Sequence, residues 1–126
     1  MLNHASVMAI RVVFTLCTSL AATYSLGAVD CAKLGKATGG PDDNFRPPVM
    51  ATVVGAGRAY FHSAPESECI TRRLFIIPGD SVTVYKPYKN WYQVMYVNNK
   101  TGEDFEGWIE DRRLRLGGTV GGDGDQ

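Results

Sequence analysis

The fold of this chain is decided by residues 77–97, which read IPGDSVTVYKPYKNWYQVMYV. The Pro-Gly-Asp triplet near the start is a strong turn signal. After it, apolar and polar residues alternate, so that Val82 and Val84 fall on one face of an extended chain. A second alternating run begins at Trp91 and ends at Val97. The period of two predicts a pair of β-strands, and not helices, in this stretch.

The same pattern continues on both sides of this stretch. Short strands separated by Gly, Pro and Asn turns are typical of a small sandwich or barrel. Closure into a barrel also removes exposed sheet edges. The sequence therefore predicts an all-β domain of about five to seven short antiparallel strands over residues 49–116, with Val94, Tyr96 and Ile109 in its core. The expected strands cover residues 49–54, 58–62, 70–77, 81–85, 91–97, 105–109 and 114–116.

Residues 1–28 have the pattern of a cleavable secretory signal. Arg11 is the only charged residue among the first 29, and the apolar run from Val12 to Leu26 follows it. That run is short for a membrane span, which needs about 20 residues, and it is followed by the small residues Gly27 and Ala28. We expect a signal-peptide helix cleaved near Gly27 or Ala28, and hence an exported, periplasmic protein that leaves the membrane after cleavage. The alternative is an uncleaved N-terminal anchor.

The cysteines agree with export. Cys17 leaves with the signal, and Cys31 and Cys69 remain. Two cysteines in a small exported domain usually pair, and a bond that closes a loop of about 39 residues is worth on the order of 4 kcal/mol. The alternative is two buried free thiols. Two cysteines and the one remaining histidine, His62, are too few for a closed tetrahedral metal site, so we expect no metal.

The flanks of the expected domain differ from it in composition. Residues 29–48 are rich in Gly, Pro and Asp, which predicts an extended arm whose one large apolar residue, Phe45, packs on the domain. Residues 117–126 contain five glycines and predict a flexible tail. The full chain has 13 basic and 13 acidic residues. This balance does not favour a nucleic-acid partner, which would require a basic excess or stripe.

Four short stretches resemble a bacterial SH3-like domain in their order and spacing. They are residues 57–65 (GRAYFHSAP), 77–80 (IPGD), 90–94 (NWYQV) and 107–109 (GWI), and Leu114 follows them. The resemblance covers Arg58 to Leu116 and implies a small SH3-like barrel. Residues 49–54 and the cysteine-tethered arm are not part of that pattern.

The resemblance also implies a function. Bacterial SH3-like domains are usually binding modules without catalytic activity, and many contact peptidoglycan peptides. We therefore expect no enzyme and no cofactor, with cell-wall peptide as the ligand. The alternative is an interaction protein that inhibits, or gives immunity against, an exported enzyme or toxin, because this domain stands alone behind its signal. The residues agree with a lack of catalysis, since His62 has no acid placed behind it in sequence and Cys69 is expected to be paired. The oligomeric state is left open.

Aromatic residues are the best candidates for a binding groove, because they are flat, rigid contact surfaces. Trp91 begins a strand after a polar turn that contains Tyr88. Trp108 is out of phase with Ile109, so it should face away from the core. Tyr88, Trp91 and Trp108 are therefore the predicted exposed groove. The alternative is that one or both tryptophans cap the ends of the barrel.

Overall fold

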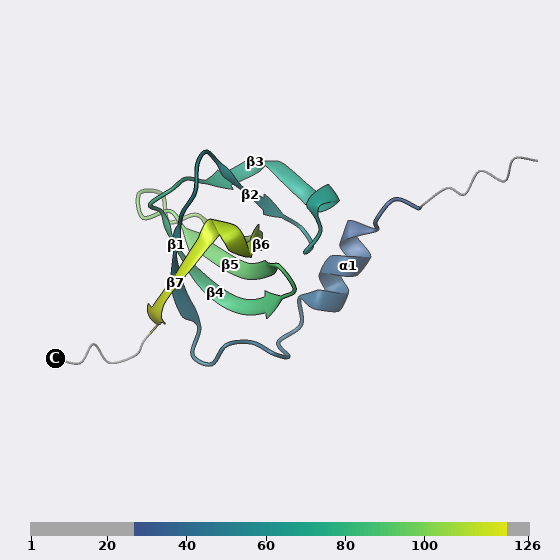
Figure 1. Ribbon diagram of the computed structural model, residues 1–126, viewed down its shortest axis with the longest axis horizontal. Coiled ribbons are helices and arrows are strands. Elements are labelled where there is room, and N and C mark those ends of the chain that lie inside the picture. The colour runs from purple at the N-terminus through teal and green to yellow at the C-terminus, as the bar shows by residue number, and fades with distance from the viewer. Residues whose placement is uncertain (1–26, 121–126) are drawn as a thin grey trace, which may run out of the picture.

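The computed structural model describes residues 27–120. Apart from Gly27 and Ala28, which have no regular structure, the expected signal peptide lies outside the described residues. Within them, one sheet of seven antiparallel strands and one short helix confirm the all-β prediction (Figure 1). The elements are α1 (Cys31–Thr38), β1 (Val49–Val53), β2 (Ala59–His62), the 3-10 turn η1 (Ser67–Cys69), β3 (Ile70–Ile76), β4 (Ser81–Tyr88), β5 (Trp91–Val97), β6 (Asp104–Glu110), the 3-10 turn η2 (Asp111–Arg113) and β7 (Leu114–Thr119).

All seven strands supply one hydrophobic core. The sheet order is β3-β2-β6-β5-β4-β1-β7, and each strand contributes at least one buried apolar side chain. A sheet whose strands all share a core must curl around it, as Figure 1 shows. Of the predicted core residues, Val94 and Ile109 are 0% and 1% exposed, and Tyr96 is partly buried against them. The remaining core members are Ala51, Val53, Ala59, Phe61, Ile76, Val82, Val84 and Leu114.

The two ends of the strand order are the edges of this curled sheet. Among the described residues, β3 pairs only with β2, and β7 pairs only with β1. After the short connection η2, β7 turns at once onto β1 with Leu114 opposite Val53. β3 and β7 are therefore the two edge strands of the sheet.

The expectation of an extended arm over residues 29–48 is wrong for Cys31–Thr38, which is helix α1. Asp30 caps the helix by accepting a hydrogen bond of 3.0 Å from the backbone N–H of Lys33. The helix itself contains alanine, leucine and lysine, which favour this conformation, and it ends before Gly39. Beyond it the arm has no regular structure, and Phe45 packs against the core as expected.

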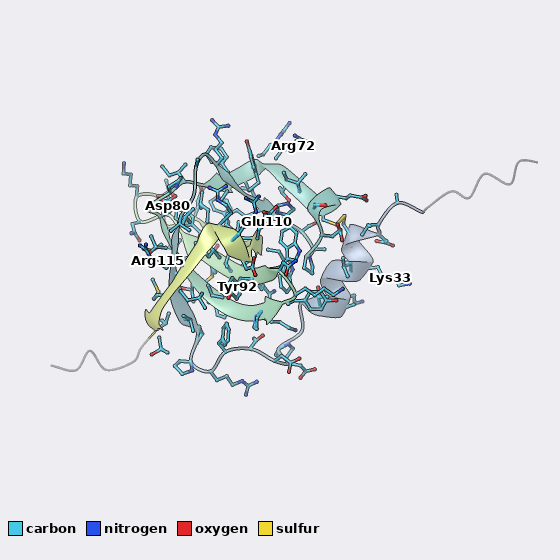
Figure 2. The ribbon with its side chains drawn as sticks, viewed as in Figure 1. Lys33, Arg72, Asp80, Tyr92, Glu110 and Arg115 are labelled. Carbon is cyan, nitrogen blue, oxygen red and sulfur yellow. A yellow bond between two sulfur atoms is a disulfide. The ribbon has the colours of Figure 1, made fainter. Side chains whose placement is uncertain are left out.

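The disulfide prediction is confirmed. Cys31 and Cys69 are bonded, with their Cα atoms 5.6 Å apart, and the bond joins the first residue of α1 to the end of η1 (Figure 2). The least exposed residues of α1 are Cys31, Leu34, Gly35 and Thr38. They recur at the spacing of one helical face, so α1 lies against the domain along one narrow stripe.

Two strand boundaries also differ from expectation. β4 continues to Tyr88, past the predicted end at Tyr85, and β7 continues to Thr119 into the predicted flexible tail. The last residues of that tail, 121–126, lie outside the described residues. The ladder between β4 and β5 shifts register after Val84, which pairs with Val94, so that Lys86 pairs with Gln93. This bulge places Lys86 on the face away from the core, where it is still buried, at 7% exposed, and donates a hydrogen bond of 3.0 Å from Nζ to the carbonyl oxygen of Gly40.

None of the described elements can cross a membrane as a helix, since α1 is too short and too polar for it.

Candidate functional site

The strand register brings the three predicted groove residues to the outer face of the sheet. Tyr88 lies opposite Trp91 across β4 and β5, and Gln93 lies opposite Trp108 across β5 and β6. Residues directly opposite each other in an antiparallel pair share a face. Trp108 in turn lies opposite His62 of β2. The three predicted groove residues therefore lie together on one face of the sheet, and His62 lies with them.

The expected exposure of Trp108 is wrong. Trp108 does face away from the core that holds Ile109, as the alternation predicted. It is nevertheless only 2% exposed. The ring of Tyr88 meets it edge-on with centroids 6.1 Å apart. Trp108 therefore belongs to a second, smaller buried layer, while Tyr88 and Trp91 stay partly exposed.

Helix α1 lies on the side of the sheet that carries this second layer. At one point α1 comes so close to the loop after β2 that a Cβ atom on Gly35 would lie 2.7 Å from the carbonyl oxygen of Ser63. Just past its end, Gly39 lies over the side chain of Gln93 on β5. Because β6 runs between β2 and β5, the helix bridges the row that contains Trp108. No local pattern predicts this position of α1, since it depends on a disulfide and on contacts between distant residues.

His62 is the buried polar member of the cluster. It is 6% exposed, its ring lies 4.6 Å from that of Trp91 in an edge contact, and Nδ1 is 3.0 Å from the carbonyl oxygen of Tyr60. Because a carbonyl only accepts, Nδ1 carries the hydrogen. Burial lowers the pKa of His62, while the backbone of Tyr60, the backbone of Trp108 and the charge of Glu110 oppose that shift. His62 is therefore neutral at pH 7. The alternation of residues along β2 is the sequence signal that could have predicted His62 on the outer face.

Two open hollows adjoin this cluster and share one wall. The first, here called the His62 hollow, has a volume of about 260 Å³ and is lined by Arg58, Tyr60, His62, Ile70, Glu110, Arg112 and Arg113, among others. The second, here called the Trp91 hollow, has a volume of about 270 Å³ and is lined by Asn90, Trp91, Glu110, Asp111 and Arg112. Glu110 and Arg112 form an ion pair in the shared wall. The Arg112 side chain is 73% exposed, so this pair is weak in water and can exchange partners.

Arg113 has a different role from its neighbour. Its guanidinium donates to the carbonyl oxygens of Val54, Gly57 and Arg58, at 2.9, 2.7 and 3.1 Å. These bonds hold the turn between β1 and β2 against η2. Arg113 therefore builds the rim of the His62 hollow, whereas Arg112 can exchange its weak surface pair with Glu110 for a ligand.

The arrangement suits binding. The hollows offer the ring of Trp91, a carboxylate and a guanidinium, all open to solvent on one side. Ser63, beside His62, directs its hydroxyl to the carbonyl of Cys69 at 3.4 Å and not to the imidazole. Among residues 27–120, no three side chains of the His, Cys, Asp or Glu type gather as metal ligands would.

Comparison of the chain with protein-family models, with curated proteins and with solved structures finds no match. The resemblance to bacterial SH3-like domains therefore stays a prediction, and the function is argued from the site.

Proposed function

We propose that this protein is an exported, non-enzymatic binding module that contacts cell-wall peptide through the Trp91 hollow and the adjoining His62 hollow. The observation that carries the proposal is the partly exposed ring of Trp91 beside a shared wall with both signs of charge, Glu110 and Arg112. The SH3-like sequence pattern supports the choice of cell-wall peptide among other ligands.

The chemistry of the ligand matches these groups. Peptides of the bacterial wall carry free carboxylates and ammonium groups along a short backbone. A carboxylate can pair with Arg112 and an ammonium with Glu110, while Trp91 packs against the peptide between them. Each exposed contact is weak. The wall, however, presents many copies of the same peptide. Avidity can therefore compensate for a modest affinity at a single site, but this requires several modules to bind together.

Sedimentation with purified peptidoglycan tests the proposal. We expect the protein to pellet with the wall material, and Trp91→Ala to reduce the retained fraction by about fivefold or more, as loss of an aromatic anchor should. Phe75→Ala is the matched control, because Phe75 is an exposed aromatic residue on β3 that lines neither hollow. Circular dichroism verifies that both variants are folded.

Two results would contradict the proposal. One is a wild-type protein that stays in the supernatant. The other is equal retention of the wild type and the folded Trp91→Ala variant, which would place any wall contact elsewhere on the molecule.

A further inference from the structure

A second surface lies on one of the two edges of the sheet, along β3 and the residues next to it. Phe75 is 39% exposed and Ile77 is 50% exposed, which is high for large apolar side chains. Arg72 and Arg73 are exposed beside them, and Arg72 points outward from β3 in Figure 2. Together with Arg58, these residues are here called the arginine edge.

The centre of the arginine edge is ordered before any partner arrives. The guanidinium carbon of Arg58 lies 4.2 Å from the centroid of the Phe75 ring, the distance of a cation–π contact. Tyr60 lies opposite Phe75 in the β2–β3 ladder, and their rings meet edge-on with centroids 6.0 Å apart. Arg58 and Tyr60 also line the His62 hollow, so the surface ends beside a cavity that can receive a side chain.

Within the described part of the chain, no arginine of this surface forms an ion pair with a carboxylate. The ion pair found there joins Arg112 to Glu110, and none involves Arg58, Arg72 or Arg73. Asp80, in the turn after β3, accepts a hydrogen bond of 3.0 Å from the backbone N–H of Ile77 instead.

The two arginines of β3 also stand away from the ladder. Between the pairs Tyr60–Phe75 and His62–Ile70, β3 carries more residues than β2. Arg72 and Arg73 fall in this bulge, so their side chains reach solvent at this edge of the sheet.

We propose that the arginine edge docks an acidic segment of a protein partner, with carboxylates on the arginines and an apolar side chain on Phe75 and Ile77. Arginine and aromatic residues carry most of the binding energy at protein interfaces, and the positive charge selects an acidic partner and speeds its association. This docking goes beyond cell-wall binding and does not depend on it.

Two other readings of the same residues are outcomes of the test. Charged residues and bulges on an edge strand prevent edge-to-edge aggregation, and the arginines could serve that purpose alone. A second copy of this chain could also supply the acidic segment, from the exposed residues Glu103, Asp104 and Glu106 at the β5–β6 hairpin.

The probe is a short synthetic peptide in which glutamate alternates with valine around a central phenylalanine. Its binding to the protein is measured by fluorescence anisotropy. We expect binding that weakens at high salt. Arg72→Glu with Arg73→Glu should weaken it by about tenfold or more, because like charges then face each other. The matched control reverses two exposed charges on α1, Lys33→Glu with Lys36→Glu, and should change the affinity by less than about twofold. Lys33 lies on the far side of α1 from Arg72 in Figure 2. Phe75→Ser should also weaken binding.

Several results would overturn the proposal. Failure of the wild type to bind, or equal weakening by both charge reversals, would show that the edge is not a specific site. Aggregation of an Arg72→Ser, Arg73→Ser variant with unchanged peptide affinity would assign the arginines to edge protection. A concentration-dependent dimer that is broken equally by arginine reversal and by Glu103→Lys would make the partner a second copy.

The wall-binding test and the peptide-binding test have independent outcomes. Trp91→Ala should leave peptide affinity unchanged, and Phe75→Ala should leave wall retention unchanged. Loss of one activity alone therefore identifies which of the two proposals is wrong.

Discussion

At the scale of single residues, His62 shows how a polar group is kept in a buried layer. It meets the ring of Trp91 on one side and bonds through Nδ1 to the carbonyl of Tyr60. Both contacts are compatible with the neutral imidazole. A charge on the ring would have to be desolvated, and this is the main reason why its pKa is lowered.

His62 should make stability depend on pH in a defined window. In the unfolded chain its pKa is about 6.5, and in the folded protein it is lower. Between these two values the unfolded state binds more protons, so stability falls as pH drops from about 6.5 to the folded pKa and then levels off. Urea unfolding at a series of pH values measures this. His62→Gln should flatten the curve in that window, and an unchanged slope would contradict the prediction.

Arg112 and Arg113 show that neighbouring residues of one type can have separate roles. Arg113 donates three hydrogen bonds to carbonyls of the β1–β2 turn, whereas Arg112 pairs with Glu110 at the surface. Their identity in the sequence does not distinguish them. The difference arises because η2 directs only one of the two side chains toward that turn.

At the scale of elements, α1 is held by a covalent bond and a close backbone approach more than by apolar burial. Its one fully buried residue is Thr38, so it contributes little hydrophobic area of its own. Cys31 fixes its start to Cys69, and Gly35 permits its contact with the loop at Ser63.

Gly35→Ala should loosen α1 although alanine is the better helix former. The new Cβ would lie 2.7 Å from the carbonyl oxygen of Ser63, so helix and loop must separate. We expect amide hydrogens of α1 to exchange about tenfold faster, since a strained contact of this kind costs roughly 1–3 kcal/mol. Gly40→Ala is the control, because a Cβ there meets open space. Equal exchange in both variants would mean that the close approach is unimportant.

Cys69→Ser should reduce the stability of the oxidised protein by about 2–4 kcal/mol. If release of α1 exposes the neighbouring Trp108, the tryptophan emission should also shift to the red. The wild type in reductant should behave like the variant. Identical melting of the wild type with and without reductant would show that the bond does not stabilise the fold.

At the scale of the whole molecule, one core joins all seven strands, and the side chains proposed to contact ligands, Trp91, Glu110, Arg112 and the arginine edge, lie outside it. These side chains can therefore change without loss of the fold. A core residue cannot, because every strand packs on the same cluster.

Ile109→Ala is the direct test of the shared core. Ile109 is 1% exposed, and truncation of such a side chain costs about 2–5 kcal/mol. Ile77→Ala removes the same atoms at a position that is 50% exposed, and we expect a change within about 0.5 kcal/mol. Both values come from urea unfolding. A similar loss of unfolding free energy in the two variants would contradict the prediction that Ile109 belongs to the core and Ile77 does not.

Much of this architecture could be predicted from the pattern of residues alone. Alternation in β4 and β5 identified the strands and placed Val82, Val84 and Val94 inward. Alternation in β6 placed Trp108 on the face opposite Ile109. What alternation could not provide was the environment of the outer face, and for this reason the exposure of Trp108 was mispredicted. The bulge that moves Lys86 outward was equally hidden, because a register shift depends on the partner strand.

The amino-acid sequence by itself determined the strands, their inward faces, the turns and the disulfide, because each follows from local periodicity or from a count of reactive side chains. Tertiary structure alone decided that α1 lies beside the row that contains Trp108, that β3 and β7 are the edge strands, and that Glu110 and Arg112 form a wall between two hollows. The physical reason is the range of the interactions. Which face of a strand is apolar is a property of neighbours in sequence, whereas the cover on its other face depends on groups that only folding brings together.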